Sequence, residues 1–102
     1  MTQLEFIEQI IKEKESVILD ANDKIWSYAE LPYEETRSSA LLCSILESEG
    51  FTVETGVAEI PTAFVARYVV GTGKTVMGIF GEFDGLATLS QKGGCAVKDT
   101  GQ

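Results

Sequence analysis

The chain has 102 residues, a formal net charge of −8 at neutral pH and no histidine. This length allows one domain at most. The absence of histidine excludes histidine general bases, triads that contain histidine and histidine-ligated metal sites within the chain. The acidic excess argues against a nucleic-acid or anionic-membrane surface, because phosphate contacts need clustered Lys and Arg. Composition therefore indicates an acidic domain of the α/β class.

Neither a membrane span nor a signal peptide is expected. No apolar run approaches the roughly 20 residues that cross a bilayer, and the first five residues carry no basic side chain. Cys43 lies in an apolar helical stretch and Cys95 in a Gly-rich stretch, so they resemble neither a disulfide framework nor a C-x-x-C metal pair. We expect a cytoplasmic protein in which Cys43 is a small core residue.

A first helix is predicted over about 2–31. Apolar residues recur there at three-, four- and seven-residue spacing, and the opposite face is charged. Thr2 and Glu5 fit a capping box at its start. Pro32 predicts its end at about residue 31, because the residue before proline is pushed out of the α region.

A second helix is predicted over about 34–49. Glu34 and Glu35 would lie in its first turn, where carboxylates favour the positive end of the helix dipole. Its apolar residues occupy more than one stripe, so it should be buried more deeply than the first helix. Gly50 fits the left-handed residue after the helix, and Phe51 can pack back on the last turn.

The rest of the chain reads as strands over about 51–55, 62–70 and 75–82. The last two are joined by the turn 71–74 and should pair as an antiparallel hairpin. The continuous apolar run in 75–82 implies cover on both faces of the sheet. Residues 90–102 show no periodicity and read as an irregular tail, so the chain is interpreted as the front part of a larger domain.

Two short segments suggest ligand chemistry. Gly71-Thr72-Gly73-Lys74-Thr75 invites a phosphate-loop interpretation, but Tyr68 occupies the first glycine position and a strand rather than a helix follows, which favours a turn. Glu82 and Asp84 follow the end of a buried strand, where α/β sheets place ligand and metal sites. Paired carboxylates there can bind a hard cation or perform acid–base work. A solvated strand-to-loop corner is the alternative.

Two further groups have structural explanations. Trp26, Tyr28 and Tyr33 could form an aromatic ligand shelf, but packing at the corner between the two helices is favoured. Arg67 could bind a carboxylate ligand, but a cross-strand surface pair is favoured.

Several segments together resemble the amino-terminal part of a metal-dependent amidohydrolase of the aminoacylase and carboxypeptidase type. The nearest branch is that of the p-aminobenzoyl-glutamate hydrolase-like and amino-acid-amide hydrolases. The resemblance covers nearly the whole chain in order. It is carried by Trp26-Ser27-Tyr28-Ala29-Glu30-Leu31-Pro32-Tyr33-Glu34-Glu35-Thr36-Arg37-Ser38-Ser39, Gly50-Phe51, Ile60-Pro61-Thr62-Ala63-Phe64-Val65-Ala66 and Gly81-Glu82-Phe83-Asp84-Gly85-Leu86.

The resemblance implies a fold and an activity. Residues 1–89 would be part of a three-layer αβα catalytic domain, with two helices followed by a mixed sheet. The intact enzyme would use a pair of zinc or manganese ions to hydrolyse an amide bond of a small acyl-amino acid or peptide, and it would be a homo-oligomer. Asp84 would lie close to the metal ligands, with Glu82 beside it, so both are near-site candidates for catalysis.

Departures from the family pattern limit what this chain can do alone. Gly85 replaces the usual alanine and Ala87 the usual proline, which implies a less rigid loop. Cys95 lacks the family's ligand context, and the family's ligand motif, glutamate pair and histidines lie beyond residue 102. The resemblance therefore implies a chain without metal ligands or cofactor that is inactive alone. A non-catalytic interaction module that docks on a partner or on itself is the alternative. A small hydrolase that uses Glu82 and Asp84 by themselves is the third hypothesis.

Overall fold

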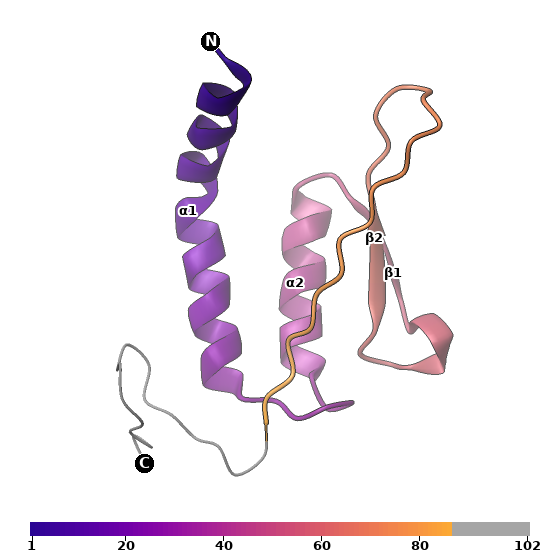
Figure 1. Ribbon diagram of the computed structural model, residues 1–102. Helices are drawn as coiled ribbons and strands as arrows, with labels where there is room; N and C mark the ends of the chain where they lie inside the picture. Colours follow the sequence, from indigo (N-terminus) through magenta and orange to yellow (C-terminus); the bar gives the residue numbers. More distant parts are fainter. Residues whose placement is uncertain (87–102) are drawn as a thin grey trace.

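The computed structural model describes residues 1–86, in the order α1 (Gln3–Tyr28), α2 (Thr36–Ser48), β1 (Thr52–Thr55), the 3₁₀ turn η1 (Val57–Glu59) and β2 (Phe64–Arg67). Figure 1 shows α2 between α1 on one side and the two strands on the other. This arrangement makes α2 the element that joins the two sides. A mixed α/β fold is therefore present, whereas the predicted tail 90–102 lies outside the described residues.

The first helix begins as the sequence predicts and ends earlier. The Thr2 hydroxyl accepts a hydrogen bond from the Glu5 N–H at 3.1 Å. α1 ends at Tyr28 rather than at about residue 31, because Ala29 adopts a left-handed conformation with φ 47°. The turn before Pro32 therefore starts three residues earlier than the proline rule alone predicts. Ala21 is the buried residue of α1.

The second helix is the more deeply buried one, as expected. Ser38, Ser39 and Cys43 are its buried residues. α2 spans Thr36–Ser48, so Glu34 and Glu35 precede its first turn instead of lying in it. Ion pairing also joins the two helices, since the Lys14 ammonium in α1 donates to Glu49 Oε2 at 2.8 Å.

The end of α2 has the left-handed glycine that the sequence predicts. Gly50 has φ 95°, its N–H donates to the Glu47 carbonyl at 3.1 Å, and the Phe51 N–H donates to the Leu46 carbonyl at 3.0 Å. These two bonds define a Schellman motif. The Phe51 ring then lies 5.3 Å from that of Tyr68, so the start of β1 is held against the chain that follows β2.

The sheet differs from the prediction in its pairing. β1 pairs antiparallel with β2, with Thr52 opposite Arg67 and Thr55 opposite Phe64. β2 is shorter than the predicted 62–70, and residues 75–82 form no strand, so the predicted hairpin across 71–74 is wrong for this structure. A strand needs a neighbour to accept and donate its backbone hydrogen bonds. No strand lies beside 75–82 among residues 1–86.

The apolar segment after β2 is exposed. Figure 1 shows residues 68–86 (orange) turning back and passing α2 toward the end of α1 that leads into α2. The large apolar side chains between 69 and 80 are 81% to 95% exposed. The sequence predicts cover on both faces of this run, and residues 1–86 provide none. These exposed residues are Val69, Val70, Val76, Met77, Ile79 and Phe80.

Candidate functional site

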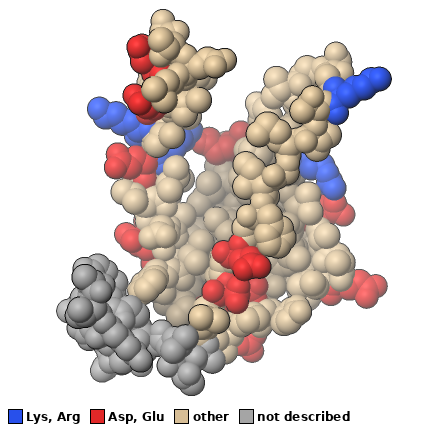
Figure 2. All heavy atoms as spheres, in the orientation of Figure 1, with Lys and Arg blue, Asp and Glu red and all other residues tan. Residues whose placement is uncertain are grey.

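The two carboxylates chosen from the sequence follow the exposed apolar segment. Glu82 and Asp84 are both exposed, and neither is in a strand. The expectation that strand geometry directs them to one face therefore finds no strand to support it. Figure 2 shows acidic groups at several separate places on the visible face, so acidity alone does not distinguish this pair from the rest of the surface.

Asp84 nevertheless lies between two anchored neighbours. On one side, the Phe83 ring packs against the Phe64 ring of β2, with centroids 6.1 Å apart and an interplanar angle of 32°. On the other side, the Gly85 N–H donates a hydrogen bond to the backbone carbonyl of Glu30. Residues 83–85 are therefore attached to the body of the fold at both ends, and Asp84 between them is exposed to solvent.

Gly85 approaches the backbone after α1 closely. A Cβ added at residue 85 would lie 3.3 Å from the Glu30 carbonyl oxygen and 3.4 Å from the Ala29 carbonyl carbon. The absence of a side chain at Gly85 permits this approach. Sequence reasoning interprets the same glycine as a source of looseness, whereas here it allows a specific attachment.

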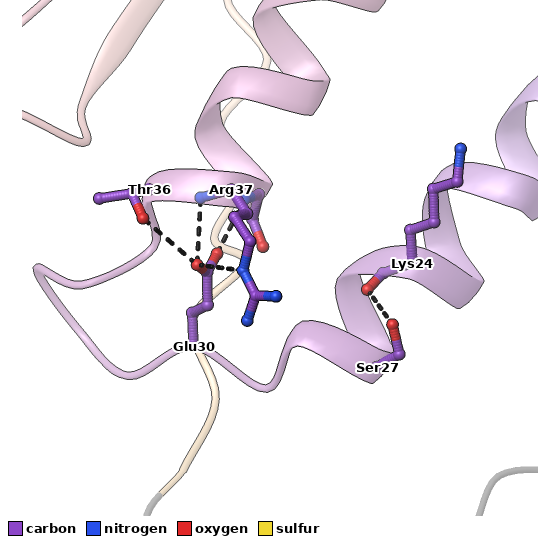
Figure 3. A network of polar contacts seen from close by, with 6 residues as sticks. Lys24, Ser27, Glu30, Thr36 and Arg37 are labelled. Atoms are coloured by element: carbon purple, nitrogen blue, oxygen red, sulfur yellow. Dashed lines mark hydrogen bonds and ion pairs between the residues drawn. The ribbon is translucent and has the colours of Figure 1, made fainter.

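The carboxylate of Glu30 holds the start of α2. Its Oε1 accepts from the Ser38 N–H at 2.8 Å, and its Oε2 accepts from the Arg37 N–H at 3.0 Å. The Arg37 Nε–H donates to the same Oε2 at 3.4 Å, and the Thr36 hydroxyl lies 3.5 Å from it (Figure 3). The first N–H groups of a helix have no partner within the helix, so Glu30 takes the role of an N-cap side chain from outside the helix.

The hydrogen bonds to Glu30 stabilise its charged form. Its side chain is only 8% exposed, and this burial tends to raise the carboxyl pKa. The N–H groups of Ser38 and Arg37, together with the Arg37 side chain, outweigh the burial and lower the pKa to about 2. Glu30 is therefore a carboxylate at neutral pH, placed where the helix dipole also favours negative charge.

Of the three aromatic residues at the corner between α1 and α2, one makes a contact with α2 and two are exposed. The Arg37 guanidinium lies over the Tyr28 ring, 4.6 Å from its centroid, which adds a cation–π contact between α1 and α2. Trp26 and Tyr33 are 56% and 73% exposed, so the expected packing at the corner is wrong for these two side chains. Within residues 1–86, no contact joins Trp26, Tyr28 and Tyr33 into one aromatic surface for a ligand.

Sequence reasoning missed Glu30 and found Arg67. As expected, Arg67 forms a cross-strand surface pair, since its Nη1 donates to Glu54 Oε2 at 3.1 Å. The signal for Glu30 was indirect. Glu35 at the N-cap of α2 makes no capping bond with its side chain. A helix start whose cap side chain makes no bond leaves its first N–H groups to water or to an acceptor from another part of the chain.

A separate cavity of about 280 Å³ lies between α2 and the sheet region. Glu82 and Asp84 do not line it. It is lined by Thr36, Ser39, Ala40, Cys43, Thr55, Pro61 and Thr62. No group of three or more Cys, Asp or Glu side chains in the described part of the chain could hold a metal ion. The residues present therefore do not fit a metal pair, and no chemical step can be assigned to one here.

One of three comparisons with known proteins found a relative. The chain is related in sequence to a subunit of p-aminobenzoyl-glutamate hydrolase from Escherichia coli (strain K12), with 45% identity over 91 residues. The match covers 89% of this chain but only 18% of that subunit. No family model and no solved structure matches the chain. Within residues 1–86, neither helix combines the length and apolar character needed to cross a membrane.

Proposed function

We propose that this chain forms the opening helices and strands of an amidohydrolase catalytic domain and is inactive without the remainder of that domain. The observation that supports this proposal most directly is the 45% identity to a p-aminobenzoyl-glutamate hydrolase subunit that is several times longer. The intact enzyme would hydrolyse the amide bond of a small acyl-amino acid, with p-aminobenzoyl-glutamate as the first substrate to test. Zinc or manganese ions would be bound by ligands outside the described residues.

The exposed apolar segment supports this proposal. Val76, Ile79 and Phe80 are 91%, 95% and 89% exposed, although burying side chains of this size is worth about 1.5–3 kcal/mol each. A segment of this composition is expected to pair with further strands and to be covered by further helices. The remainder of a larger catalytic domain would supply both.

Asp84 is the residue proposed to lie nearest the chemistry, with Glu82 beside it. Its exposure leaves the carboxylate free to face whatever docks on this side, and its anchored neighbours Phe83 and Gly85 restrict where it can lie. A carboxylate held in this way can orient a metal ligand or a water molecule.

The test is a chimera in which the 91 aligned residues of this chain replace their counterpart in the Escherichia coli subunit. With Zn²⁺ or Mn²⁺, we expect the chimera to release p-aminobenzoate from p-aminobenzoyl-glutamate and the 102-residue chain to release none. Asp84→Asn should lower the kcat of the chimera about 10- to 100-fold, the usual effect of losing a group that orients a ligand. Asp23→Asn, in the exposed face of α1, is the matched control and should leave kcat unchanged.

Two results would contradict the proposal. One is a chimera that folds, as judged by circular dichroism and gel filtration, yet has no activity. The other is turnover by the isolated chain that disappears in Asp84→Ala, which would support the third hypothesis of a small carboxylate hydrolase.

A second candidate function is that of a non-catalytic module that associates with itself. The same exposed segment favours it, because unpaired apolar strands associate readily. Sedimentation equilibrium distinguishes the two candidates. Self-association that is abolished by Ile79→Lys, in a chain whose chimera is inactive, would favour the module. A monomer with a cooperative thermal transition would contradict it.

A further inference from the structure

We propose that Glu30 is a positioning residue for Asp84, since one residue links the start of α2 to the segment that carries Asp84. The catalytic meaning of this link rests on the proposed function, but the link itself is a claim about geometry. It predicts that a substitution of the Glu30 side chain weakens the hydrogen bond of the Gly85 N–H, in a different part of the chain.

The side chain of Glu30 provides the fixed end of the link. Both carboxylate oxygens are used, one on the Ser38 N–H at 2.8 Å and the other on the Arg37 N–H at 3.0 Å. Ser38 is fully buried in α2, the helix that contacts both α1 and the sheet. The carboxylate is thus attached to the most buried helix of the described fold, and it holds the backbone of residue 30 in place.

The backbone of Glu30 provides the other end. Its carbonyl accepts from the Gly85 N–H, and Gly85 lies so close that a methyl group there would lie 3.3 Å from that oxygen. The carbonyl and the carboxylate belong to one residue, so a backbone shift that follows loss of the carboxylate contacts would displace the carbonyl as well. In Figure 3 the faint trace of the later chain passes directly beside Glu30.

Phe83 supplies the second anchor of the segment. Its ring packs on Phe64 of β2, and Asp84 lies between this contact and Gly85. With Gly85 released, the Phe83 ring contact is the attachment that remains within residues 83–86. In the described part of the chain, Asp84 is therefore held by two contacts, one through Glu30 and one through Phe83.

The alternative is that Glu30 only caps α2 and stabilises the fold as a whole. In that case a change at Glu30 would speed exchange with solvent at all protected amides together, since every amide would open by the same global route. A positioning role predicts a different pattern, in which the Gly85 amide changes by itself.

The experiment measures amide hydrogen exchange by NMR in the full 102-residue chain. Glu30→Gln keeps the shape of the side chain but replaces one acceptor oxygen with a donor, so it cannot accept from both N–H groups. Glu34→Gln is the matched control, because Glu34 is an exposed carboxylate in the same turn. The Cys43 amide in α2 and the amides that pair β1 with β2 report on the fold as a whole.

We expect the Gly85 amide of Glu30→Gln to exchange about 5- to 10-fold faster, the effect of losing one hydrogen bond. The reference amides should stay within twofold of the unchanged chain, and Glu34→Gln should change neither. Unchanged exchange at Gly85, or equal acceleration at every amide, would overturn the proposal. Neither outcome depends on hydrolysis, so this test fails or succeeds separately from the proposed function.

Gly85→Ala keeps the proposal testable if Glu30→Gln does not fold. It crowds the Glu30 carbonyl and leaves the carboxylate alone, so the amide of residue 85 should exchange faster while that of Ser38 stays protected. Unchanged exchange at residue 85 would overturn the proposal. Where both variants fold, the double variant should accelerate exchange at residue 85 by less than the product of the two single accelerations. The reason is that both substitutions act on one contact.

Discussion

The carboxylate of Glu30 accepts a hydrogen bond from the Ser38 N–H at 2.8 Å, across eight residues and a turn. This contact replaces the N-cap bond that Glu35 does not make. It also means that a charged group, rather than a neutral hydroxyl, completes the start of α2. The stability of this corner should therefore depend on pH.

The first prediction concerns acid. The pKa of Glu30 is lowered from 4.5 to about 2 in the folded chain, so its carboxylate stabilises the fold fully above about pH 4.5. This contribution is lost as the pH falls from 4.5 toward 2. We expect the difference in free energy of unfolding between the unchanged chain and Glu30→Gln to shrink across that window, as measured by urea denaturation. A difference that stays constant from pH 7 to pH 2.5 would contradict the assignment.

The second prediction concerns Arg67 and Glu54. Both side chains of this ion pair are 62% exposed, and exposed pairs contribute roughly 0.2–1 kcal/mol. Arg67→Gln should therefore lower the free energy of unfolding by less than about 1 kcal/mol, and added salt should reduce the effect further. A larger loss in urea denaturation would mean that Arg67 has a partner beyond Glu54.

The third prediction concerns the thiol of Cys43. Burial raises its pKa, and little thiolate is present at neutral pH. In a Cys95→Ser background, which leaves one thiol, we expect Cys43 to react with a disulfide reagent about tenfold or more slowly in the folded chain than in urea. Equal rates in the two states would show that α2 opens freely.

The fourth prediction concerns the start of α1. Thr2→Ala removes the hydroxyl that accepts from Glu5, which should cost about 1 kcal/mol of local helix stability. Because the first turns of α1 are exposed, the loss should appear as reduced helical circular dichroism with little change in the unfolding of α2. Thr2→Ser keeps the hydroxyl and serves as the control. An unchanged helical signal in Thr2→Ala would show that the cap contributes nothing.

Local signals in the sequence predicted the helices and the first strand. The Thr2 cap, the left-handed Gly50 and the alternation before Thr55 each act within a few residues, and the structure contains all three. The relation to a hydrolase subunit was also accessible, since the resemblance was carried by segments spread along the chain.

Features that depend on distant contacts were predicted less well. Residues 75–82 have the composition of a strand, but strand formation requires a partner that residues 1–86 do not supply. The role of Glu30 depends on Ser38 and Gly85, and no local pattern connects the three. Whether Asp84 and Glu82 act in catalysis stays a prediction.

Residues 68–74 are an exposed stretch without regular secondary structure, and Arg67 and Lys74 flank it. Trypsin cleaves after Arg and Lys, so the peptide bonds that follow these two residues are open to it. A cut there would sever the covalent route from β2 to Asp84 while sparing the helices. Within residues 75–86, the Phe83 ring on Phe64 and the Gly85 hydrogen bond to the Glu30 carbonyl would then help to retain the piece severed after Lys74. Co-elution of the two nicked parts would show that non-covalent contacts hold the severed piece, without altering a single side chain.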